Sequence, residues 1–346
     1  MLASDFDYEL PQELIAQRPL AERSASRMLV IDRHSGIWSD AWVRELPERL
    51  GEGDCLVVNN SRVLAARIVG KRRPPQGGQL GGAAEILVVE PEDAPAGIWR
   101  ALVRPSRKLR PGSLVETDWA TIKVLGHAGH GMRTVEFLDL SGAAVNRLLA
   151  SRGHVPLPPY IRRDDDTADR ERYQTVFARE PGSVAAPTAG LHFDKPLLDR
   201  IRRRGASVAE LTLHVGPGTF RPVSEPHVEN HRMHAERFEV PEATADAIRG
   251  ARRTIAVGTT VVRALETAAA RGEPIRPQHG ETDLFIAPGF RFHAVDALLT
   301  NFHLPRSTLL MLVAAFAGED LVRRAYAHAM RQRYRFYSYG DCMLIV

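Results

Sequence analysis

The chain has 346 residues, 44% of them hydrophobic and 25% charged, with a formal net charge of +4 at pH 7. This length and composition exclude a disordered protein and predict a large core in one or two domains. The net charge is too small to indicate nucleic-acid binding by itself. The two cysteines, Cys55 and Cys342, belong to no paired motif, so we expect no disulfide scaffold, zinc site or iron–sulfur cluster.

The distribution of apolar residues predicts a cytoplasmic protein without membrane contact. The opening residues, MLASDFDYELPQEL, are acidic and lack the apolar run of a signal peptide. The longest apolar stretch, Leu309 to Ala317, is too short to cross a bilayer. Unpaired cysteines fit a reducing compartment.

The first 150 residues predict two kinds of structure. Residues 11–16 suggest a short helix, residues 27–31 a strand, and residues 56–58 a buried strand. Short β-rich runs then follow one another, separated by turn signals. We expect these runs to form a small antiparallel β-barrel, with strands near residues 65–70, 84–90, 98–103, 113–116, 121–125 and 133–138.

From residue 151 onward the pattern alternates between strands and helices. Strands are expected at residues 207–215 and 254–257, and helices at residues 194–205, 243–252, 260–271, 309–316 and 320–331. The alternation predicts an α/β fold with a mostly parallel sheet and flanking helices. Residues 1–63 and 151–346 would form this domain, and residues 64–150 the inserted barrel domain. Ligands bind such sheets outside the carboxyl ends of the strands.

Two small-residue segments near expected strand ends carry histidines. His192 precedes the helix expected at residues 194–205 and has an ordinary pKa near neutrality, so it can act as an acid or a base. The alternative is a structural histidine in a tight turn. The strand that contains His214 runs into Gly216-Pro217-Gly218, which is not a dinucleotide fingerprint and alone indicates only a turn.

A third segment, Gly258-Thr259-Thr260, leads from a buried strand into a helix. Such a helix start can bind carboxylate, phosphate or ribose oxygens, and Arg263 follows one turn later. The alternative is an ordinary helix cap with a solvated arginine. Residues 230–236 supply two histidines and a glutamate but no His-Glu-x-x-His motif, so we expect no metal.

Aromatic and charged residues alternate in residues 334–341, which include Tyr337 and Tyr339. Aromatic faces stack on bases and arginines pair with phosphates, a combination that suits RNA or a nucleoside. Packed core aromatics are the alternative. The residues alone predict an α/β enzyme with a His- and Gly-rich pocket, without identifying its reaction.

Longer motifs extend along nearly the whole chain. They lie at residues 5–17, 153–161, 172–177, 185–193, 213–220, 257–260, 300–310 and 334–341. Together they resemble the S-adenosylmethionine:tRNA ribosyltransferase-isomerase family, QueA, and the resemblance is weakest in the barrel-like segment. The sequence departs from the family pattern at Asn60, Pro217, Ala235 and Glu281.

The resemblance implies an activity in queuosine biosynthesis. The family moves the ribosyl part of S-adenosylmethionine onto 7-aminomethyl-7-deazaguanine at the tRNA wobble position, giving epoxyqueuosine-tRNA, adenine and methionine. It implies an active site near the junction of an α/β domain and a barrel. The partners would be S-adenosylmethionine, as co-substrate without a further cofactor, and the tRNA anticodon stem-loop. We expect a monomer.

This chemistry needs a positioned base and an acid for the leaving adenine. The candidate acid–base groups are His192, His214, Asp283 and Asp341. The residues expected to hold the substrates are Thr188, Gly190, Gly216, Gly218, Thr219, Gly258, Thr259, Thr260, Arg263, His303, Tyr337 and Tyr339.

Three other functions fit the residues less well. A divergent paralogue of the same fold would act on a free nucleoside or a small molecule. A non-catalytic RNA-binding module would not need acid–base groups at strand ends. A Rossmann methyltransferase would need an early Gly-rich loop and a ribose-binding acid, which this sequence lacks.

Overall fold

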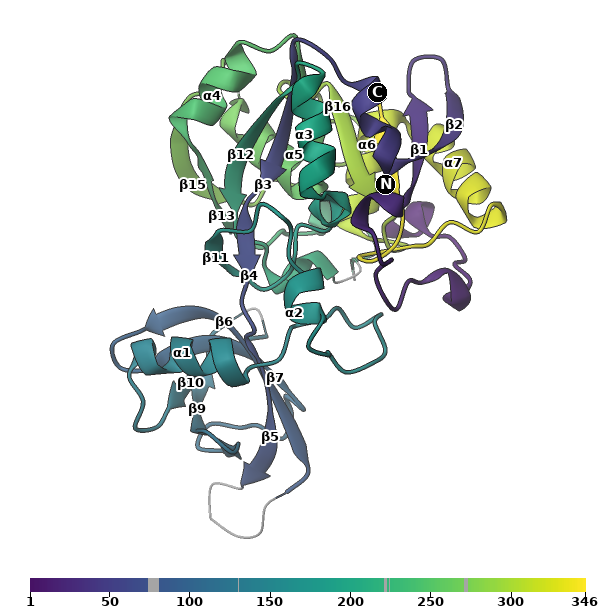
Figure 1. Ribbon diagram of the computed structural model, residues 1–346. Coiled ribbons are helices and arrows are strands. Elements are labelled where there is room, and N and C mark those ends of the chain that lie inside the picture. Colours follow the sequence, from purple (N-terminus) through teal and green to yellow (C-terminus); the bar gives the residue numbers. More distant parts are fainter. Residues whose placement is uncertain (74–80, 130, 221–222, 224, 271–272) are drawn as a thin grey trace.

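The computed structural model describes the chain except residues 74–80, 130, 221–222, 224 and 271–272 (Figure 1). A large sheet with helices on both faces fills the upper part of the view, and a closed barrel lies below it. A short parallel pair, β4 (Ser61–Val63) and β11 (Glu180–Ser183), lies where the chain passes between them.

The large sheet is mixed. Its strands in spatial order are β15 (Gln278–Thr282), β13 (Glu236–Val240), β12 (Ser207–Leu213), β3 (Asp54–Asn59), β14 (Arg253–Val257), β16 (Ala297–Asn301), β17 (Cys342–Ile345), β1 (Arg27–Asp32) and β2 (Ile37–Trp42). Only β12, β3, β14 and β16 form a continuous parallel block. The prediction of a mostly parallel sheet is wrong, because β13, β15 and β2 add antiparallel pairs at the edges and β17 runs antiparallel to β16.

Strand β3 shows why the sheet has two covered faces. Cys55 and Val57 point into one hydrophobic cluster, whereas Leu56 and Val58 point into another. One cluster contains α4 (Glu242–Arg249), α5 (Thr259–Ala268), α6 (Thr308–Ala317) and α7 (Glu319–Arg331). The other contains α3 (Lys195–Arg203) and the 3-10 helix η4 (Val43–Arg49). A central strand buried on both sides is expected to be apolar along its length, as β3 is.

The predicted barrel is confirmed. Its strands in order are β10 (Arg133–Phe137), β7 (Ile98–Arg104), β6 (Ala83–Asp93), β5 (Arg67–Arg73), β8 (Leu114–Glu116) and β9 (Thr121–His127). Ala84, Ile86 and Val88 of β6 alternate into its core. Helix α1 (Gly142–Arg152), which the sequence analysis did not predict, packs Val145 and Leu149 against the same core. The division of the chain at residues 63 and 150 stays a prediction.

The remaining elements are short. They are α2 (Asp169–Arg172) and the 3-10 helices η1 (Ala3–Phe6), η2 (Gln12–Leu14), η3 (Arg23–Ala25), η5 (Thr188–His192), η6 (Pro217–Phe220) and η7 (Val228–Asn230). The helix expected at residues 11–16 is thus a single 3-10 turn. Among the described residues, no helix has both the length and the apolarity needed to span a membrane.

Candidate active site

The loops that carry the sequence motifs meet at one edge of the large sheet. Strands β12, β14 and β16 are aligned in one direction, so the residues that follow them lie side by side. Strand β17 runs the opposite way beside β16, and the residues that precede it therefore reach the same edge. Three pockets lie along this edge.

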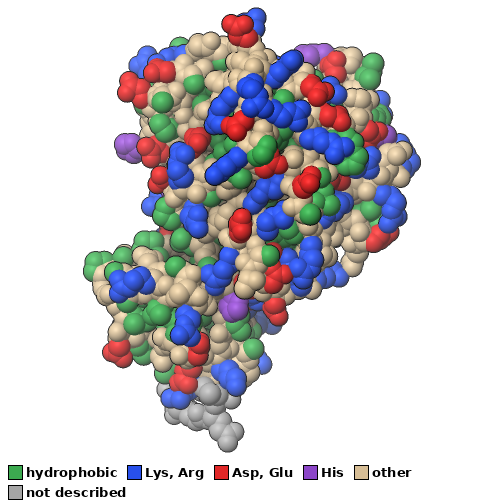
Figure 2. All heavy atoms as spheres, viewed as in Figure 1, with side chains coloured by type: hydrophobic (Ala, Val, Ile, Leu, Met, Phe, Trp, Pro, Cys, Tyr) green, Lys and Arg blue, Asp and Glu red, His purple; other side chains and the backbone are tan. Residues whose placement is uncertain are grey.

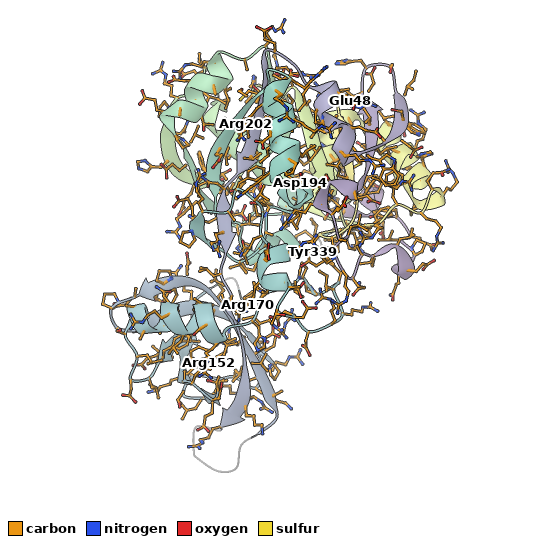
Figure 3. All side chains as sticks on the ribbon, viewed as in Figure 1. Glu48, Arg152, Arg170, Asp194, Arg202 and Tyr339 are labelled. Carbon is orange, nitrogen blue, oxygen red and sulfur yellow. The ribbon has the colours of Figure 1, made fainter. Side chains whose placement is uncertain are left out.

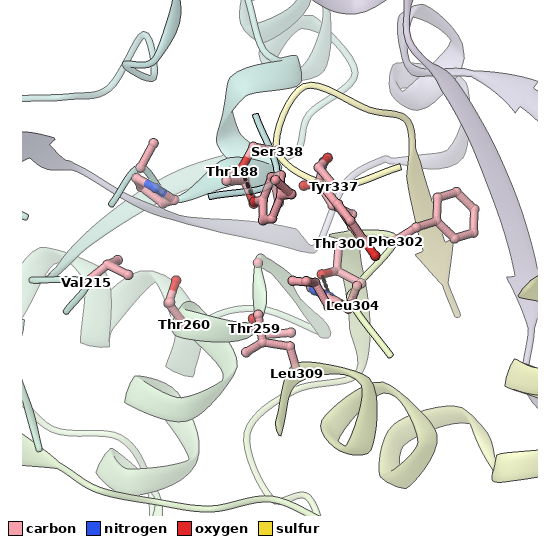
Figure 4. A pocket seen from close by; sticks show the side chains of 17 residues that line it. Thr188, Val215, Thr259, Thr260, Thr300, Phe302, Leu304, Leu309, Tyr337 and Ser338 are labelled. Atoms are coloured by element: carbon pink, nitrogen blue, oxygen red, sulfur yellow. Dashed lines mark hydrogen bonds between the residues drawn. The ribbon is translucent and has the colours of Figure 1, made fainter. Parts of the chain in front are cut away.

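The first pocket, here the threonine pocket, has a volume of about 550 Å³. Its wall combines threonines, aromatic rings and small residues (Figure 4). It is lined by Tyr160, Ala186, Pro187, Thr188, Ala189, Val215, Gly258, Thr259, Thr260, Thr300, Asn301, Phe302, His303, Leu304, Leu309, Tyr337 and Ser338. It therefore unites six of the predicted residues: Thr188, Gly258, Thr259, Thr260, His303 and Tyr337.

Two residues of this wall have a left-handed backbone. Gly258, which caps α5, has a φ of 99°, a conformation that side chains rarely tolerate. Tyr337 has a φ of 71° although it is not glycine, at a cost of about 1–3 kcal/mol. Its carbonyl accepts hydrogen bonds from Gly340 N–H (2.9 Å) and from the amide of Asn301 (3.0 Å), which hold the turn in place.

Asn301 presents a buried acceptor in the threonine pocket. Its Nδ2 donates to the carbonyl of Tyr337 (3.0 Å) and to Nε2 of His192 (3.2 Å). A carbonyl can only accept, so Nδ2 must face Tyr337 and Oδ1 must point the other way. Oδ1 of Asn301 has no hydrogen-bond partner among the described residues. A buried acceptor left unpaired is costly unless a ligand satisfies it.

His303 is held inside the same wall. Its Nε2 lies 2.8 Å from the hydroxyl of Thr300. Burial lowers the pKa of His303 to about 3, so its ring is neutral near pH 7. The neutral ring of His303 therefore orients the hydroxyl of Thr300 and adds no charge to the pocket.

The second pocket, here the interlobe pocket, has a volume of about 760 Å³ and lies between the barrel and the sheet. It is lined by Val89, Glu90, Leu102 and Met132 of the barrel region, and by Gly182, Val184, His214, Val215, Gly216, Pro217, Gly218, His234, Ala235, Glu236, Arg237 and Glu281. It unites the predicted residues His214, Gly216 and Gly218. Val215 lines both pockets.

The lining of the interlobe pocket is rich in carboxylates. It includes Glu90, Glu236 and Glu281, together with Arg237. Glu236 is paired with Arg263 and Glu90 with Arg100 (3.1 Å), so Glu281 is the glutamate of this lining without an ion pair among the described residues. Closely placed carboxylates in a partly enclosed space attract cations, because the field between low-dielectric walls is concentrated. In this pocket the carboxylate of Glu281 remains available to a cationic ligand.

His214 lines this pocket with one ring nitrogen buried. Its ring packs against Gly182, where a Cβ would lie only 2.7 Å from Nδ1 of His214. Nδ1 is buried and has no hydrogen-bond partner among the described residues. Burial, and secondarily the charge of Arg237, lower the pKa of His214. At neutral pH the ring is thus uncharged and available as a base.

Arg263 does not point at a ligand, contrary to the sequence prediction. It is buried and forms an ion pair with the equally buried Glu236. Its Nε also donates to the carbonyl of Leu284 (2.9 Å). Glu236 in turn accepts from the N–H of Gly216 (2.8 Å). Arg263 therefore connects α5, which starts at the threonine pocket, with the turn after β12 in the interlobe pocket.

The third pocket, here the arginine pocket, is smaller, about 270 Å³. It is lined by Pro19, Leu20, Glu22, Arg23, Ser26, Arg172, Leu191, His192, Ser338, Tyr339 and Gly340. It contains the predicted residues His192 and Tyr339 and shares Ser338 with the threonine pocket. Burial first, then the charges of Arg335 and Arg23, lower the pKa of His192 to about 4. His192 therefore stays neutral and accepts the Asn301 hydrogen bond.

The remaining predicted residues lie elsewhere. Asp283 is exposed and lines none of the three pockets. Asp341 is buried, and its carboxylate accepts the backbone N–H groups of Arg27 (2.9 Å) and Arg335 (2.8 Å), so it fixes the chain rather than facing a ligand. Gly190 packs closely against Thr175.

Two further predicted residues need separate comment. The ring of Tyr339 is buried, and its hydroxyl donates to Asp169 (2.8 Å), so it is not free to stack on a base. The side chain of Thr219 lies outside the described part of the structure.

Sequence reasoning missed Asn301 and Glu236 as site residues. Asn301 is the last residue of β16 and Glu236 the first residue of β13, two strands that were not predicted. For Asn301 the available signal was a polar residue at the end of the apolar run Ala297–Leu299. Glu236 had no such signal, because its partner Arg263 lies on another element.

Three of the four departures from the family pattern lie in one pocket. Pro217, Ala235 and Glu281 line the interlobe pocket. Asn60 is buried at the end of β3, where its Oδ1 accepts from the hydroxyl of Thr212 (2.8 Å). Among the residues that the structure describes, no group of three or more His, Cys, Asp or Glu side chains could hold a metal ion.

A mixed sheet with ligand-sized pockets at its strand ends, one of them completed by a barrel, defines a two-lobed α/β enzyme. Residues 3–345 match the sequence family described as "Queuosine biosynthesis protein". The S-adenosylmethionine:tRNA ribosyltransferase-isomerases of Solibacter usitatus and Geobacter sulfurreducens are 52% and 50% identical to this chain, each over 100% of both chains. The chain therefore belongs to the S-adenosylmethionine:tRNA ribosyltransferase-isomerase family, which confirms the resemblance seen in its motifs.

A solved structure agrees with this assignment. The crystal structure of an S-adenosylmethionine tRNA ribosyltransferase from Thermotoga maritima has 38% sequence identity and a TM-score of 0.56 to this chain. The comparison covers 99% of this chain and 100% of that one.

Proposed function

We propose that the protein transfers and isomerises the ribosyl part of S-adenosylmethionine onto 7-aminomethyl-7-deazaguanine at the wobble position of tRNA. The products are epoxyqueuosine-tRNA, adenine and methionine. The observation that carries this proposal is the full-length identity of 52% to a relative with that activity in its name. We also propose that the protein works as a monomer in the cytoplasm and that S-adenosylmethionine is its only co-substrate.

The threonine pocket fits the deazaguanine base. The unpaired Oδ1 of Asn301 can accept from an N–H group on the edge of the base. Tyr337 and Tyr160, with ring centroids 4.7 Å apart, offer aromatic surface in the same wall. Proteins that read single-stranded RNA combine such edge contacts with aromatic stacking. Moving a base out of the anticodon stack costs a few kcal/mol, which these contacts can offset.

The interlobe pocket fits S-adenosylmethionine. Its sulfonium and ammonium groups are cations, and the pocket presents the carboxylate of Glu281, while the carboxylates of Glu90 and Glu236 are paired with arginines. Gly216 and Gly218 leave room for a ligand close to the backbone, and Glu236 is held in place by Arg263. Because Val215 lines both pockets, a donor and an acceptor bound in them are next to each other.

The chemistry then needs a base that is unprotonated at neutral pH and lies beside the donor. The sulfonium acidifies the adjacent ribose methylene, and we propose that neutral His214 removes its proton. The resulting ylide rearranges and expels adenine, the aminomethyl nitrogen attacks the ribosyl carbon, and epoxide closure expels methionine. His192, whose Nε2 is occupied by Asn301, positions the base pocket rather than moving this proton.

The test is incubation of the protein with S-adenosylmethionine and an anticodon stem-loop carrying the precursor base. Adenine release is followed by chromatography, and the nucleosides of the digested RNA by mass spectrometry. We expect equal amounts of adenine and epoxyqueuosine. The free precursor base, as a parallel substrate, should give neither product. Turnover of the free base with no reaction on RNA would overturn the proposal in favour of a small-molecule enzyme.

A further inference from the structure

The arginine pocket contains two guanidinium groups without an ion-pair partner. Arg23 donates to the carbonyls of Leu191 (3.1 Å) and Glu171 (3.1 Å), and Arg172 to those of Leu20 (2.6 Å) and Ala21 (3.2 Å). Neither arginine forms a salt bridge within the part of the chain that the structure describes. The nearby Arg163, by contrast, pairs with the Asp169 carboxylate at 2.6 Å.

These charges are also partly removed from water. Burial, and next the charge of Arg172, lower the pKa of Arg23. Burial likewise lowers the pKa of Arg335, whose charge is also felt by His192 in the pocket wall. For Arg163, the hydrogen bond to Asp169 raises the pKa instead. Glu171 and Asp194 partly offset the charge of Arg23, and Asp341 that of Arg335, but less than burial does. Half-buried like charges without a direct ion pair are costly, so an anionic ligand would stabilise Arg23 and Arg172.

Two donors of these arginines have no partner among the described residues. They are Nε of Arg172 and Nη1 of Arg335, both buried. Arg172 and Arg335 also hold residues 18–20 in place. Arg335 donates to the carbonyl of Arg18, and Arg172 donates to the carbonyl of Leu20. Bracing uses only part of the donor set of each guanidinium, because each carries five N–H groups. It therefore does not account for the unpaired donors.

The position of the pocket suggests the source of the anion. Ser338 lines both this pocket and the threonine pocket, and His192 in its wall is bonded to Asn301. In Figure 3, Tyr339 of the pocket lies between Asp194 at the start of α3 and Arg170 of α2. Lys and Arg side chains gather over this same face in Figure 2. An anion bound here neighbours whatever occupies the threonine pocket.

We propose that the arginine pocket binds a backbone phosphate of the RNA, next to the nucleotide whose base enters the threonine pocket. Arg23 and Arg172 supply the guanidinium forks, a geometry that matches phosphate oxygens. This inference rests on the proposed function, because it takes RNA as the partner.

The first experiment measures binding of the precursor stem-loop by fluorescence anisotropy at several salt concentrations. Arg23→Gln and Arg172→Gln should each weaken binding about tenfold, and the slope of log K against log salt should fall by about 0.7 for one lost phosphate contact. The matched control is Arg202→Gln, which removes one positive charge from the exposed ion pair with Asp199. The control should change affinity less than twofold.

The second experiment identifies the phosphate. Stem-loops with one neutral methylphosphonate linkage, on either side of the wobble nucleotide, are tested against the wild type and Arg23→Gln. With one of the two linkages, the effect of Arg23→Gln should disappear, since both changes remove the same contact. If the effect persists unchanged with both linkages, the proposal is overturned and the arginines only brace the chain.

Two further outcomes separate the alternatives. A raised KM for S-adenosylmethionine with unchanged RNA affinity would assign the pocket to the donor carboxylate and overturn the proposal. If the Gln variants unfold at lower temperature, Arg23→Lys provides the test. Lysine keeps the positive charge but lacks the paired N–H donors of the guanidinium, so the variant should retain most of the slope of log K against log salt. A wild-type protein that binds RNA through this pocket but releases no adenine would contradict the proposed function and not this inference.

Discussion

The threonine pocket and the interlobe pocket share Val215, yet they are built from different parts of the molecule. The threonine pocket is made by segments at the edge of the large sheet, and its histidine is neutral. The interlobe pocket needs the barrel to complete it and carries three glutamates. The difference suggests a division of work, in which one pocket recognises an uncharged base and the other holds a cationic donor.

The largest effect is expected where the two pockets are joined. Arg263→Met leaves the Glu236 carboxylate buried without its partner, which costs about 3–5 kcal/mol in the free energy of unfolding. Urea denaturation measures this loss. Arg249→Met, which breaks an exposed pair with Asp246, is the control and should cost less than about 1 kcal/mol. If the two substitutions cost the same, the buried pair does not hold the pockets together.

The next effect should be confined to the interlobe pocket. His214→Ala should lower the rate of adenine release about 10²-fold or more, because the proton of the ribose methylene loses its acceptor. Single-turnover kinetics at saturating substrates measure the rate. His279→Ala, at an exposed position on β15, should leave the rate unchanged. A rate within threefold of wild type would remove His214 from the mechanism.

A smaller effect should be confined to the threonine pocket. The hydroxyl of Thr188 lines this pocket, so Thr188→Val removes a polar contact at constant shape. We expect KM for the RNA to rise about three- to tenfold, which corresponds to the usual net free energy of one hydrogen bond. KM for S-adenosylmethionine should stay constant. The control is Thr121→Val on β9 of the barrel. A change in the KM for S-adenosylmethionine alone would reverse the assignment of the two pockets.

The last effect leaves activity at neutral pH aside and concerns stability at acid pH. The pKa of His303 is about 3 in the folded protein and about 6.5 in the unfolded chain. The neutral ring therefore contributes stability that is complete above about pH 6.5 and is lost as the pH falls, at up to about 1.4 kcal/mol per pH unit. His303→Gln should flatten the pH dependence between pH 6.5 and pH 4 in urea titrations, whereas His279→Gln should not. Equal slopes for both variants would contradict the pKa of His303.

The local features of the fold could be predicted because short-range patterns encode them. All six barrel strands lie at the expected runs, and Asp194 caps α3 as its sequence indicated. The direction of the sheet strands could not be predicted. Whether β17 runs with or against β16 depends on pairing between residues far apart in the chain, and no local pattern records it.

The same limit applies to the candidate site. Gly258 and Thr260 were found because a strand, a glycine and a helix start follow one another in the sequence. Arg263 has the same local context, but its guanidinium is directed by Glu236, which comes from another strand. Asp341 looked reactive in the sequence, although its carboxylate binds the N–H of Arg27 at the other end of the chain.

The position of β17 has a consequence for biosynthesis. This strand lies between β16 and β1, so the central sheet stays open until residues 342–345 have emerged from the ribosome. The barrel pairs neighbouring segments and can fold much earlier. A nascent polypeptide would therefore carry a finished barrel beside an unfinished sheet until residues 342–345 had emerged.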